Sequence, residues 1–415
     1  DIQNNMKFNI SPFERNKGYV YILYSALFIS SFNIISIFFE KVILGERLIF
    51  ADFSVYRCGA ITFLNNINPY KASALSECLG SYPNALDFFY PPFTLNFFSL
   101  FSKISEINSI ILWGIILLPI IILNLFLMHK LFFKKKNFFL FILIYFFSFG
   151  GLNFTGLLTG NITIVFYSCL GISFYYAIIN KNTIPIFFIL TIMSLFKITY
   201  LIFLVLFFFL EKKKYFKFSF ITLFAIVTFY LFSYLNDPKI FLDFINHLSY
   251  IRSNEFFNLY GGGFGLYSII KEFPSIFFSN YSNHPLLIQL IWILICSLFL
   301  LSTFLLIYTN KTNFSKLEIL SIGILTISIC YPVIKDYEGF LLVPCIYYLL
   351  FNLNFKSIFK NNAKVIQYII LFLTFSIHDK YILFLTAITL FFLITYINFK
   401  KNKIFIKKKL LTKEI

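Results

Sequence analysis

The chain has 415 residues, of which 59% are hydrophobic and only 13% are charged, and its formal net charge is +17. Soluble domains usually carry about 25% charged residues, so this composition excludes a soluble protein. The lysines stand in short clusters beside apolar runs, which excludes nucleic-acid binding and indicates the cytoplasmic ends of membrane spans. Apolar runs of about 20 residues recur along the chain, which predicts an all-α polytopic membrane protein.

Basic residues set the expected topology from the N-terminus. Arg15 and Lys17 precede the first expected span, residues 18–39, so we place the N-terminus on the cytoplasmic side. The segment 40–108 is then extracytoplasmic. Within it, residues 93–101 are apolar but too short to cross a membrane. We interpret them as a re-entrant or interfacial helix that begins after a Pro-Pro pair.

Two of the six cysteines, Cys58 and Cys78, fall in the segment 40–108. An extracytoplasmic segment lies in an oxidising compartment, so a disulfide between these two residues remains open. The other four cysteines fall in or near apolar runs and are expected to be packing residues. No spacing of His and Cys is typical of a metal site, and we expect no metal.

The apolar run 184–210 departs from a simple alternation of crossings. It follows expected spans at 109–131, 137–150 and 161–180, and it carries Lys197 at its centre. Lysines flank the run on both sides, so both of its ends are expected in the cytoplasm. We therefore predict two half-helices that meet near Lys197, whose side chain then points into the protein. The alternative is that the Lys197 side chain extends to the cytoplasmic surface.

The rest of the chain continues the alternation. Residues 215–234 are expected to cross to a second extracytoplasmic segment, 236–284. The remaining expected spans are 285–306, 317–331, 339–354, 365–377 and 381–398. Together they predict one membrane domain, 1–415, with about ten spans, a re-entrant pair and a lysine-rich cytoplasmic tail at 399–415.

Asp52 is the first candidate for chemistry. It lies about a dozen residues past the first expected span, so its carboxylate can sit at the membrane face without crossing hydrocarbon. A base is needed at such a place if an interfacial hydroxyl is joined to a group carried on a lipid. The alternative is a helix N-cap, because Asp before an amphipathic run is a common helix start.

Five further charged residues are candidates. Lys335, Asp336 and Glu338 follow the end of an expected span, where they form either part of a site or a solvated loop. Arg57 and Arg252 are extracytoplasmic in a chain that uses Lys at most basic positions. This choice favours binding of phosphate by the planar guanidinium group, and the alternative is a surface position at the level of the lipid headgroups.

Together with further motifs, these residues resemble glycosyltransferase family 87, the bacterial polyprenol-phosphate-mannose-dependent α-mannosyltransferases of the C-type glycosyltransferase fold. The resemblance covers roughly residues 45–350. Two features depart from the family pattern, because Ile198-Thr199 replaces a usual Pro and the late motif lacks the Trp and His that often occur there. The motifs that match are Asp52-Phe53-x-x-Tyr56, Asn68-Pro69-Tyr70, Tyr90-Pro91-Pro92, Gly160-Asn161, Lys197 and Pro332-x-x-Lys335-Asp336-Tyr337-Glu338.

The resemblance implies an inverting transfer of a hexose, expected to be mannose, from a polyprenyl-phosphate donor to a hydroxyl of a lipid or glycan acceptor. The reaction is expected at the extracytoplasmic face of a bacterial inner membrane, with Asp52 as general base and with neither a metal nor another cofactor. The resemblance assigns the donor phosphate to Lys197, Arg57, Arg252 and Lys335, and the substrates to Tyr56, Asn68, Tyr70, Tyr90, Asn161, Asp336, Tyr337 and Glu338.

A second class of function also fits a lysine within a broken span. It comprises a polytopic transporter and a flippase or polymerase of lipid-linked glycans. A transporter built from repeats would show a second broken pair in a matching half, which the sequence lacks. Turnover of a lipid-phosphate sugar would favour the transferase, and vectorial movement without bond formation would favour the transporter.

Overall fold

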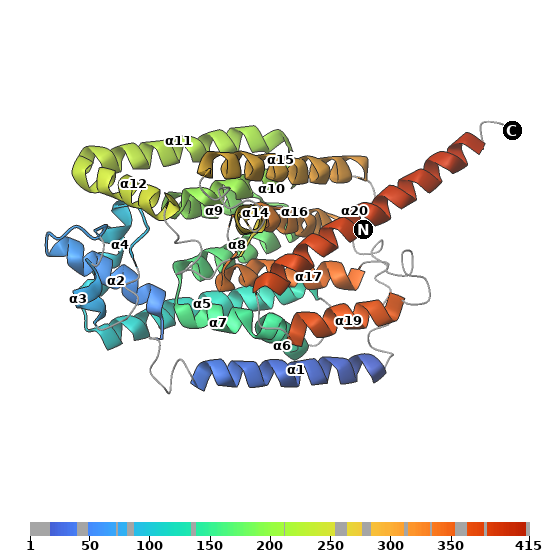
Figure 1. Ribbon diagram of the computed structural model, residues 1–415, viewed down its shortest axis with the longest axis horizontal. Coiled ribbons are helices and arrows are strands. Elements are labelled where there is room, and N and C mark those ends of the chain that lie inside the picture. Colours follow the sequence, from blue (N-terminus) through green and yellow to red (C-terminus); the bar gives the residue numbers. More distant parts are fainter. Residues whose placement is uncertain are drawn as a thin grey trace.

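The computed structural model describes residues 17–39, 49–71, 74–80, 87–133, 138–210, 212–253, 264–275, 284–310, 314–332, 334–352, 363–376 and 380–411. Within these ranges the regular structure is helical, and a single isolated bridge pairs Phe264 with Ile334. The predicted all-α class is therefore confirmed. The long helices lie side by side in a bundle, and the last turns of the final helix project beyond it (Figure 1).

The helices follow one another along the chain with short connections, and most coincide with the apolar runs. Their bounds are α1 Lys17–Phe38, α2 Ala51–Leu64, α3 Ser76–Leu79, α4 Phe93–Ser102, α5 Glu106–Phe132, α6 Phe138–Phe147, η2 Ser148–Gly150, α7 Leu152–Thr159, α8 Ile162–Ile179, α9 Ile184–Phe196, η3 Ile198–Leu204, α10 Val205–Leu210, α11 Lys212–Asn236, α12 Pro238–Ser253, α14 Leu266–Ser275, α15 Pro285–Thr309, α16 Lys316–Cys330, η5 Asp336–Glu338, α17 Gly339–Asn352, α19 Ala363–Ser376 and α20 Lys380–Leu411.

Several of these helices are long and apolar enough to cross a membrane. Among the described residues there are five such helices, within α5, α8, α11, α15 and α20, or six if the bent pair α6–α7 counts as one span. The chain is thus a multi-pass membrane protein. The figure of about ten spans remains a prediction, because α16, α17 and α19 have only 14 or 15 residues each.

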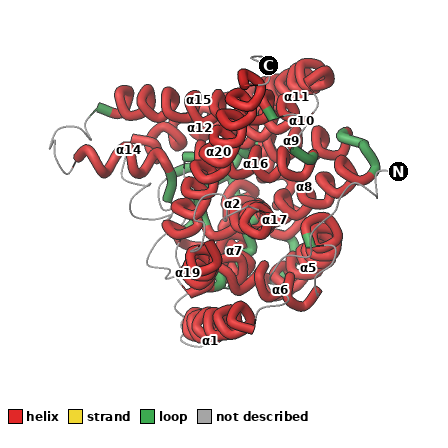
Figure 2. Tube along the Cα trace, turned by 90° about the vertical axis from the view of Figure 1, so that its right-hand side faces the viewer, coloured by secondary structure: helices red, strands yellow, loops and turns green. Residues whose placement is uncertain are grey.

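The core of the bundle is built around α17, which lies among the other helices when the bundle is viewed along its length (Figure 2). All its residues from Gly339 to Leu350 are buried. Its neighbour α16 is buried along nearly its whole length. The outer helices keep large apolar side chains exposed, such as Ile115 and Leu118 on α5, as a surface in contact with lipid requires.

The run 184–210 consists of two pieces, as predicted. The helix α9 ends at Lys197, which is extended (φ −149°, ψ 106°), and η3 and α10 follow. Phe187 of α9 stacks on Phe218 of α11, and the Thr191 hydroxyl is hydrogen-bonded to that of Thr222. Partners in both pairs are 31 residues apart in sequence, so the two helices advance in the same direction and α9 runs parallel to α11. Two parallel neighbours require the intervening η3 and α10 to run back. The chain therefore reverses within this run, as two half-helices predict, and re-entry of the pair into the membrane remains a prediction.

A second broken pair is present, which the sequence did not reveal, so the lack of one no longer counts against a transporter. The helices α6 and α7 meet at an angle of 86°. Phe149, Gly150 and Gly151 all have positive φ at this bend, a conformation that glycine adopts at little cost. We expected the span to end at residue 150, whereas the chain continues as α7 to Thr159.

Four of the shorter helices, α2, α3, α4 and α12, lie at one end of the bundle (Figure 1). We call this end the site end. The predicted short helix at 93–101 is present as α4, which follows Pro92. A disulfide joins Cys58 of α2 to Cys78 of α3, which settles the open question of their pairing.

Candidate active site

Asp52 lies in the first turn of α2 at the site end. The N-cap residue of α2 is Phe50, in the left-handed conformation, and no side chain caps the helix. The N-cap alternative for Asp52 is therefore wrong. Instead, Nδ2 of Asn161 donates a hydrogen bond of 2.7 Å to Oδ2 of Asp52. The positive end of the α2 dipole also favours a carboxylate at this position.

The Gly160-Asn161 pair holds the hydrogen-bond donor in place. Gly160 has a φ of +64°, and a Cβ atom added there would lie 2.7 Å from Cβ of Phe50, so only glycine fits. The backbone N–H of Phe50 donates to the carbonyl of Leu158 at 2.8 Å, which ties the start of α2 to the end of α7. Oδ1 of Asn161 caps α8, and Nδ2 of the same amide remains for Asp52.

Lys197 reaches the same end of the bundle from the break between α9 and η3. Its Nζ atom lies 5.5 Å and 5.6 Å from the ring centroids of Tyr200 and Tyr331, within the range of cation–π contacts. The hydroxyl groups of these rings are fixed by hydrogen bonds of 2.8 Å to Thr163 and 2.9 Å to Thr199. Lys197 thus points into the protein, and the alternative that it extends to the cytoplasmic surface is wrong.

The stretch from Lys335 to Glu338 packs into the bundle. Glu338 is only 6% exposed, and its Oε2 atom accepts a hydrogen bond of 2.5 Å from the backbone N–H of Lys335. Its Oε1 atom is buried and has no hydrogen-bond partner in the described part of the chain. A Cβ atom at Gly156 of α7 would lie 3.1 Å from the backbone of Asp336, so α7 and η5 are in close contact. The alternative of a solvated loop is wrong.

These side chains form one charged group with mutual electrostatic effects. Burial raises the pKa of Asp52, and the Asn161 hydrogen bond and the charge of Lys335 oppose that rise. Burial raises the pKa of Glu338 to about 7, against the charges of Lys197 and Lys335. Burial lowers the pKa of Lys335, and the charge of Lys197 lowers it further. Acidic and basic side chains from α2, η5 and the α9–η3 break therefore act on one another.

Two predicted tyrosines line the same region. The hydroxyl groups of Tyr56 and Tyr90 are 2.9 Å apart, and the backbone N–H of Ile162 donates to Tyr56 at 3.4 Å. Tyr56 lies one helical turn after Asp52 on the same face of α2. Burial and the negative charge of Asp52 both raise the pKa of Tyr90. Both rings therefore lie beside the predicted base.

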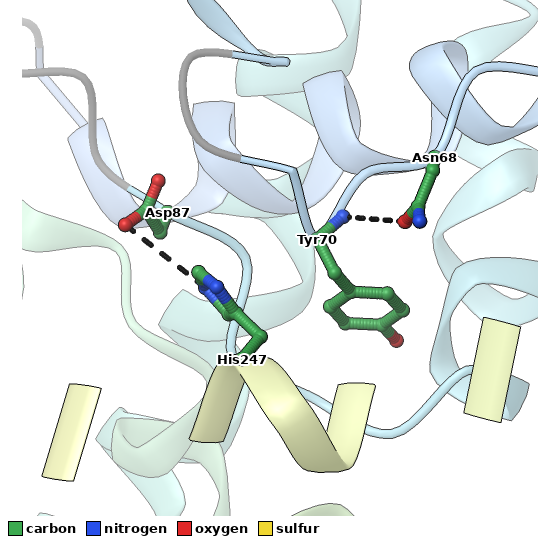
Figure 3. Close-up of polar contacts among 4 residues, drawn as sticks. All are labelled: Asn68, Tyr70, Asp87 and His247. Carbon is green, nitrogen blue, oxygen red and sulfur yellow. Dashed lines mark hydrogen bonds and ion pairs between the residues drawn. The ribbon is translucent and has the colours of Figure 1, made fainter. Parts of the chain in front are cut away.

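The Asn68-Pro69-Tyr70 motif makes its contacts with the protein. Oδ1 of Asn68 accepts from the backbone N–H of Tyr70 at 2.9 Å (Figure 3). Nδ2 of Asn68 donates to Asp243 of α12 at 2.6 Å. The Tyr70 hydroxyl donates to the carbonyl of Tyr90 at 2.7 Å. Substrate binding by Asn68 and Tyr70 remains a prediction.

Arg57 is not part of the charged group. Arg57 is five residues after Asp52, on a different face of α2. Its Nη2 atom donates to the carbonyl of Ile104, between α4 and α5. The side chain of Arg252 lies outside the described residues. A role in binding phosphate remains a prediction for both.

Sequence reasoning missed Tyr200 and Tyr331, the two rings beside Lys197. The chain has 27 tyrosines and 62 phenylalanines, so a single aromatic residue carries little information. The available signal was position, because Tyr200 follows Lys197 by three residues and Tyr331 directly precedes Pro332 of the late motif.

The arrangement suits acid–base chemistry on an anionic substrate. Asp52 offers a carboxylate of raised pKa that can accept a proton, and Lys197 and Lys335 offer positive charge to an anionic group. Within the described ranges, no three His, Cys, Asp or Glu side chains form a group that could hold a metal ion.

Comparison with known proteins gives one match. A family model described as Glycosyltransferase family 87 matches residues 88–332, more than half of the chain. The matched span includes Tyr90, Asn161 and Lys197, begins after Asp52 and ends before Lys335. No curated protein and no solved structure matches the chain.

Proposed function

The chain belongs to glycosyltransferase family 87, and from this premise we propose that it transfers a hexose from a polyprenyl-phosphate carrier to an acceptor hydroxyl. Family membership and the apolar helices together make the protein a multi-pass membrane glycosyltransferase. Membership favours a transferase over the transporter and flippase alternatives. The donor, the sugar, the stereochemistry and the base belong to the proposal.

One observation carries the proposal: the carboxylate of Asp52 accepts a hydrogen bond from Asn161 and lies within electrostatic reach of Lys335. Lys335 in turn lies within electrostatic reach of Lys197. A sugar donor with a phosphate leaving group needs a base for the acceptor and positive charge for the departing phosphate. The two demands are met by different residues. A lipid-linked donor also explains why the site lies at the end of a membrane bundle.

The reaction is a single displacement. The acceptor oxygen attacks the anomeric carbon while Oδ1 or Oδ2 of Asp52 takes the hydroxyl proton. A carbon–oxygen bond forms to the acceptor, and the bond between the anomeric carbon and the phosphate oxygen breaks. The bonding pair leaves with the phosphate, so the polyprenyl phosphate gains one negative charge, next to Lys197 and Lys335. One displacement inverts the configuration at the anomeric carbon.

We place the site on the extracytoplasmic side of a bacterial inner membrane. The disulfide between Cys58 and Cys78 at the site end supports this orientation, because disulfides persist in oxidising compartments. The lysines 212–214 begin α11, at the end remote from the site, as the positive-inside rule requires of a cytoplasmic end. A cysteine at position 213 that is labelled from outside intact cells would contradict this orientation.

The proposed donor is tested with purified protein in lipid nanodiscs and an acceptor lipid extract. We expect transfer from labelled polyprenyl-phosphate mannose and none from GDP-mannose or UDP-glucose. Turnover with a nucleotide sugar alone would overturn the proposed donor. A polyprenyl-phosphate glucose arm tests the identity of the sugar separately from the class of carrier.

The base is tested with Asp52→Asn. We expect turnover to fall by about 10²–10⁴-fold, the usual contribution of a general base. The amide is nearly the same size as the carboxylate, so a matched elution profile and thermal unfolding curve establish that the variant folds. If Asp52→Asn retains turnover while Asp336→Asn or Glu338→Gln abolishes it, the base is misassigned.

A further inference from the structure

The helix α12 is attached to the site end by two polar contacts with the segment that precedes α4. Asp243 of α12 accepts the 2.6 Å hydrogen bond from Asn68. One turn further along α12, Nε2 of His247 lies 4.0 Å from Oδ2 of Asp87 (Figure 3). The His247 ring also stacks on Phe89, with ring centroids 5.6 Å apart.

The helix α12 has one exposed face and one buried face. Leu242, Ile245 and Leu248 are 51%, 39% and 37% exposed, whereas Phe244 and His247 are 2% and 7% exposed. The exposed apolar face is typical of a helix that lies along a membrane surface. The buried face rests on Tyr70, whose ring centroid is 5.5 Å from that of Phe244.

A continuous set of hydrogen bonds leads from α12 to the proposed base. Asp243 binds the Asn68 amide, and the other end of that amide holds the backbone N–H of Tyr70. The Tyr70 hydroxyl then holds the carbonyl of Tyr90. The remaining links join the Tyr90 hydroxyl to that of Tyr56, which also accepts from the backbone N–H of Ile162. Ile162 follows Asn161, whose amide binds Asp52.

We propose that Asn68 and Asp243 form a clamp through which α12 sets the position of Tyr90 and, through it, the Asn161–Asp52 pair. Asn68 and Tyr70 are then positioning residues that act on the reaction without touching the sugar. This role rests on the proposed function, because it is expressed as an effect on glycosyl transfer. It gives the segment 236–284 a task in the site that its sequence does not reveal.

The occupied polar atoms support a positioning role. Both polar atoms of the Asn68 side chain are engaged by protein groups, and Tyr70 is only 4% exposed with its hydroxyl already donating. A sugar hydroxyl would have to displace these bonds to bind either side chain. Loss of one bond in the set is expected to shift Tyr90, and a misplacement of about 1 Å can cost on the order of 10² in rate.

The test exchanges the two partners. Asp243→Ala and Asn68→Asp each break the bond, the second by placing two carboxylates against each other. The double variant Asn68→Asp with Asp243→Asn restores it, because the new amide donates to the new carboxylate, which still accepts from the Tyr70 N–H. We expect each single variant to lower kcat by about 10–100-fold with little change in the donor KM. The double variant should return to within about threefold of wild type.

Two results would overturn the clamp. One is a double variant, Asn68→Asp with Asp243→Asn, whose kcat stays as low as that of Asn68→Asp alone. The other is an Asp243→Ala variant with the kcat of wild type. Both results are expected if Asn68 binds the sugar directly. Asn246→Ala, at an exposed position on the same helix, is the matched control and should leave kcat unchanged.

A second readout does not depend on the reaction. Thermal unfolding of Asn68→Ala, Asp243→Ala and the double alanine variant forms a double-mutant cycle. For a clamp, the double variant unfolds at nearly the temperature of the less stable single variant. Additive losses overturn the clamp. If wild-type protein shows no transfer from any polyprenyl-phosphate sugar, the proposed function fails while this cycle still decides whether the clamp exists.

Discussion

Two helices in the described part of this protein are broken, and the two breaks bring residues to the site end in different ways. The α6–α7 bend consists of Phe149, Gly150 and Gly151, all at positive φ, and carries no charge. The α9–η3 break lies at Lys197, whose ammonium group stands beside two tyrosine rings. The first break changes the direction of the backbone, so that α7 ends at the turn that holds Asn161. The second break places the positive charge of Lys197 at the site end.

The difference shows that a break in a membrane helix has two separable uses. A glycine bend changes where the following helix ends. The bend also leaves backbone N–H and C=O groups without their helical hydrogen bonds, so neighbouring elements must provide partners for them. A lysine at a break places charge at a depth where charge is expensive, which is justified only by a charged partner. The two breaks should therefore respond differently to substitution.

Of the two breaks, the charged one is expected to show the larger effect on substitution. Lys197→Met should lower kcat by about 10²–10³-fold, since a preorganised group that stabilises developing negative charge is usually worth that much. Lys197→Arg keeps the charge and should lose less. The measurement is steady-state transfer, together with inhibition by free polyprenyl phosphate, which should weaken in Lys197→Met. If the methionine variant turns over normally, the lysine serves only the backbone break.

A smaller effect is expected at two glycines, one within the uncharged bend and one at the end of the helix α7 that follows it. Both Gly151→Ala and Gly160→Ala place a side chain at positive φ, which costs about 1–3 kcal/mol of stability. The new Cβ atom meets Ile34 of α1 in the first case and Phe50 beside Asp52 in the second. Both variants should unfold at lower temperature, but only Gly160→Ala should also lower kcat, by about tenfold. Equal kcat values would contradict the positioning role of this turn.

The smallest expected effect concerns Glu338, which lies near both lysines. Burial raises the pKa of Glu338 in the folded protein to about 7, above its ordinary value of 4.5. The native state therefore binds this proton more tightly than the unfolded state, and wild-type stability falls as pH rises from about 4.5 to 7. Glutamine does not titrate, so the Glu338→Gln variant does not lose stability in this way as the pH rises. The melting temperature of the variant minus that of wild type should rise by a few degrees between pH 5 and pH 8. A difference that does not change with pH would contradict the raised pKa of Glu338.

The sequence predicted the helices well where an apolar run had a clear end. Residues 109–131 were expected and α5 covers Glu106–Phe132, because Ser105 caps the helix and lysines follow it. It failed at α7, since Ser148-Phe149-Gly150-Gly151 is typical of the end of a span. A local pattern does not reveal that the chain bends and continues.

The candidate site was predicted from residues whose chemistry is unusual in a membrane chain. Asp52, Lys197 and Glu338 stood out because charge is rare in this sequence. The tyrosines beside Lys197 did not, since their roles depend on contacts between segments far apart in the chain. Asn68 was recognised by its motif, yet its partner Asp243 lies 175 residues away and no spacing rule connects them.

The disulfide between Cys58 and Cys78 has a consequence for the biogenesis of this enzyme. It closes a loop that begins on the helix carrying Asp52, with a sequence separation of 20 residues, and a crosslink of this span stabilises a fold by about 3 kcal/mol. Insertion into the membrane depends on the apolar helices and needs no oxidant. Maturation is then a two-stage process, in which a correctly inserted chain becomes fully stable at its site end only after thiol oxidation. Cells that lack thiol-oxidising enzymes on that side of the membrane would accumulate an inserted precursor with a loosened α2.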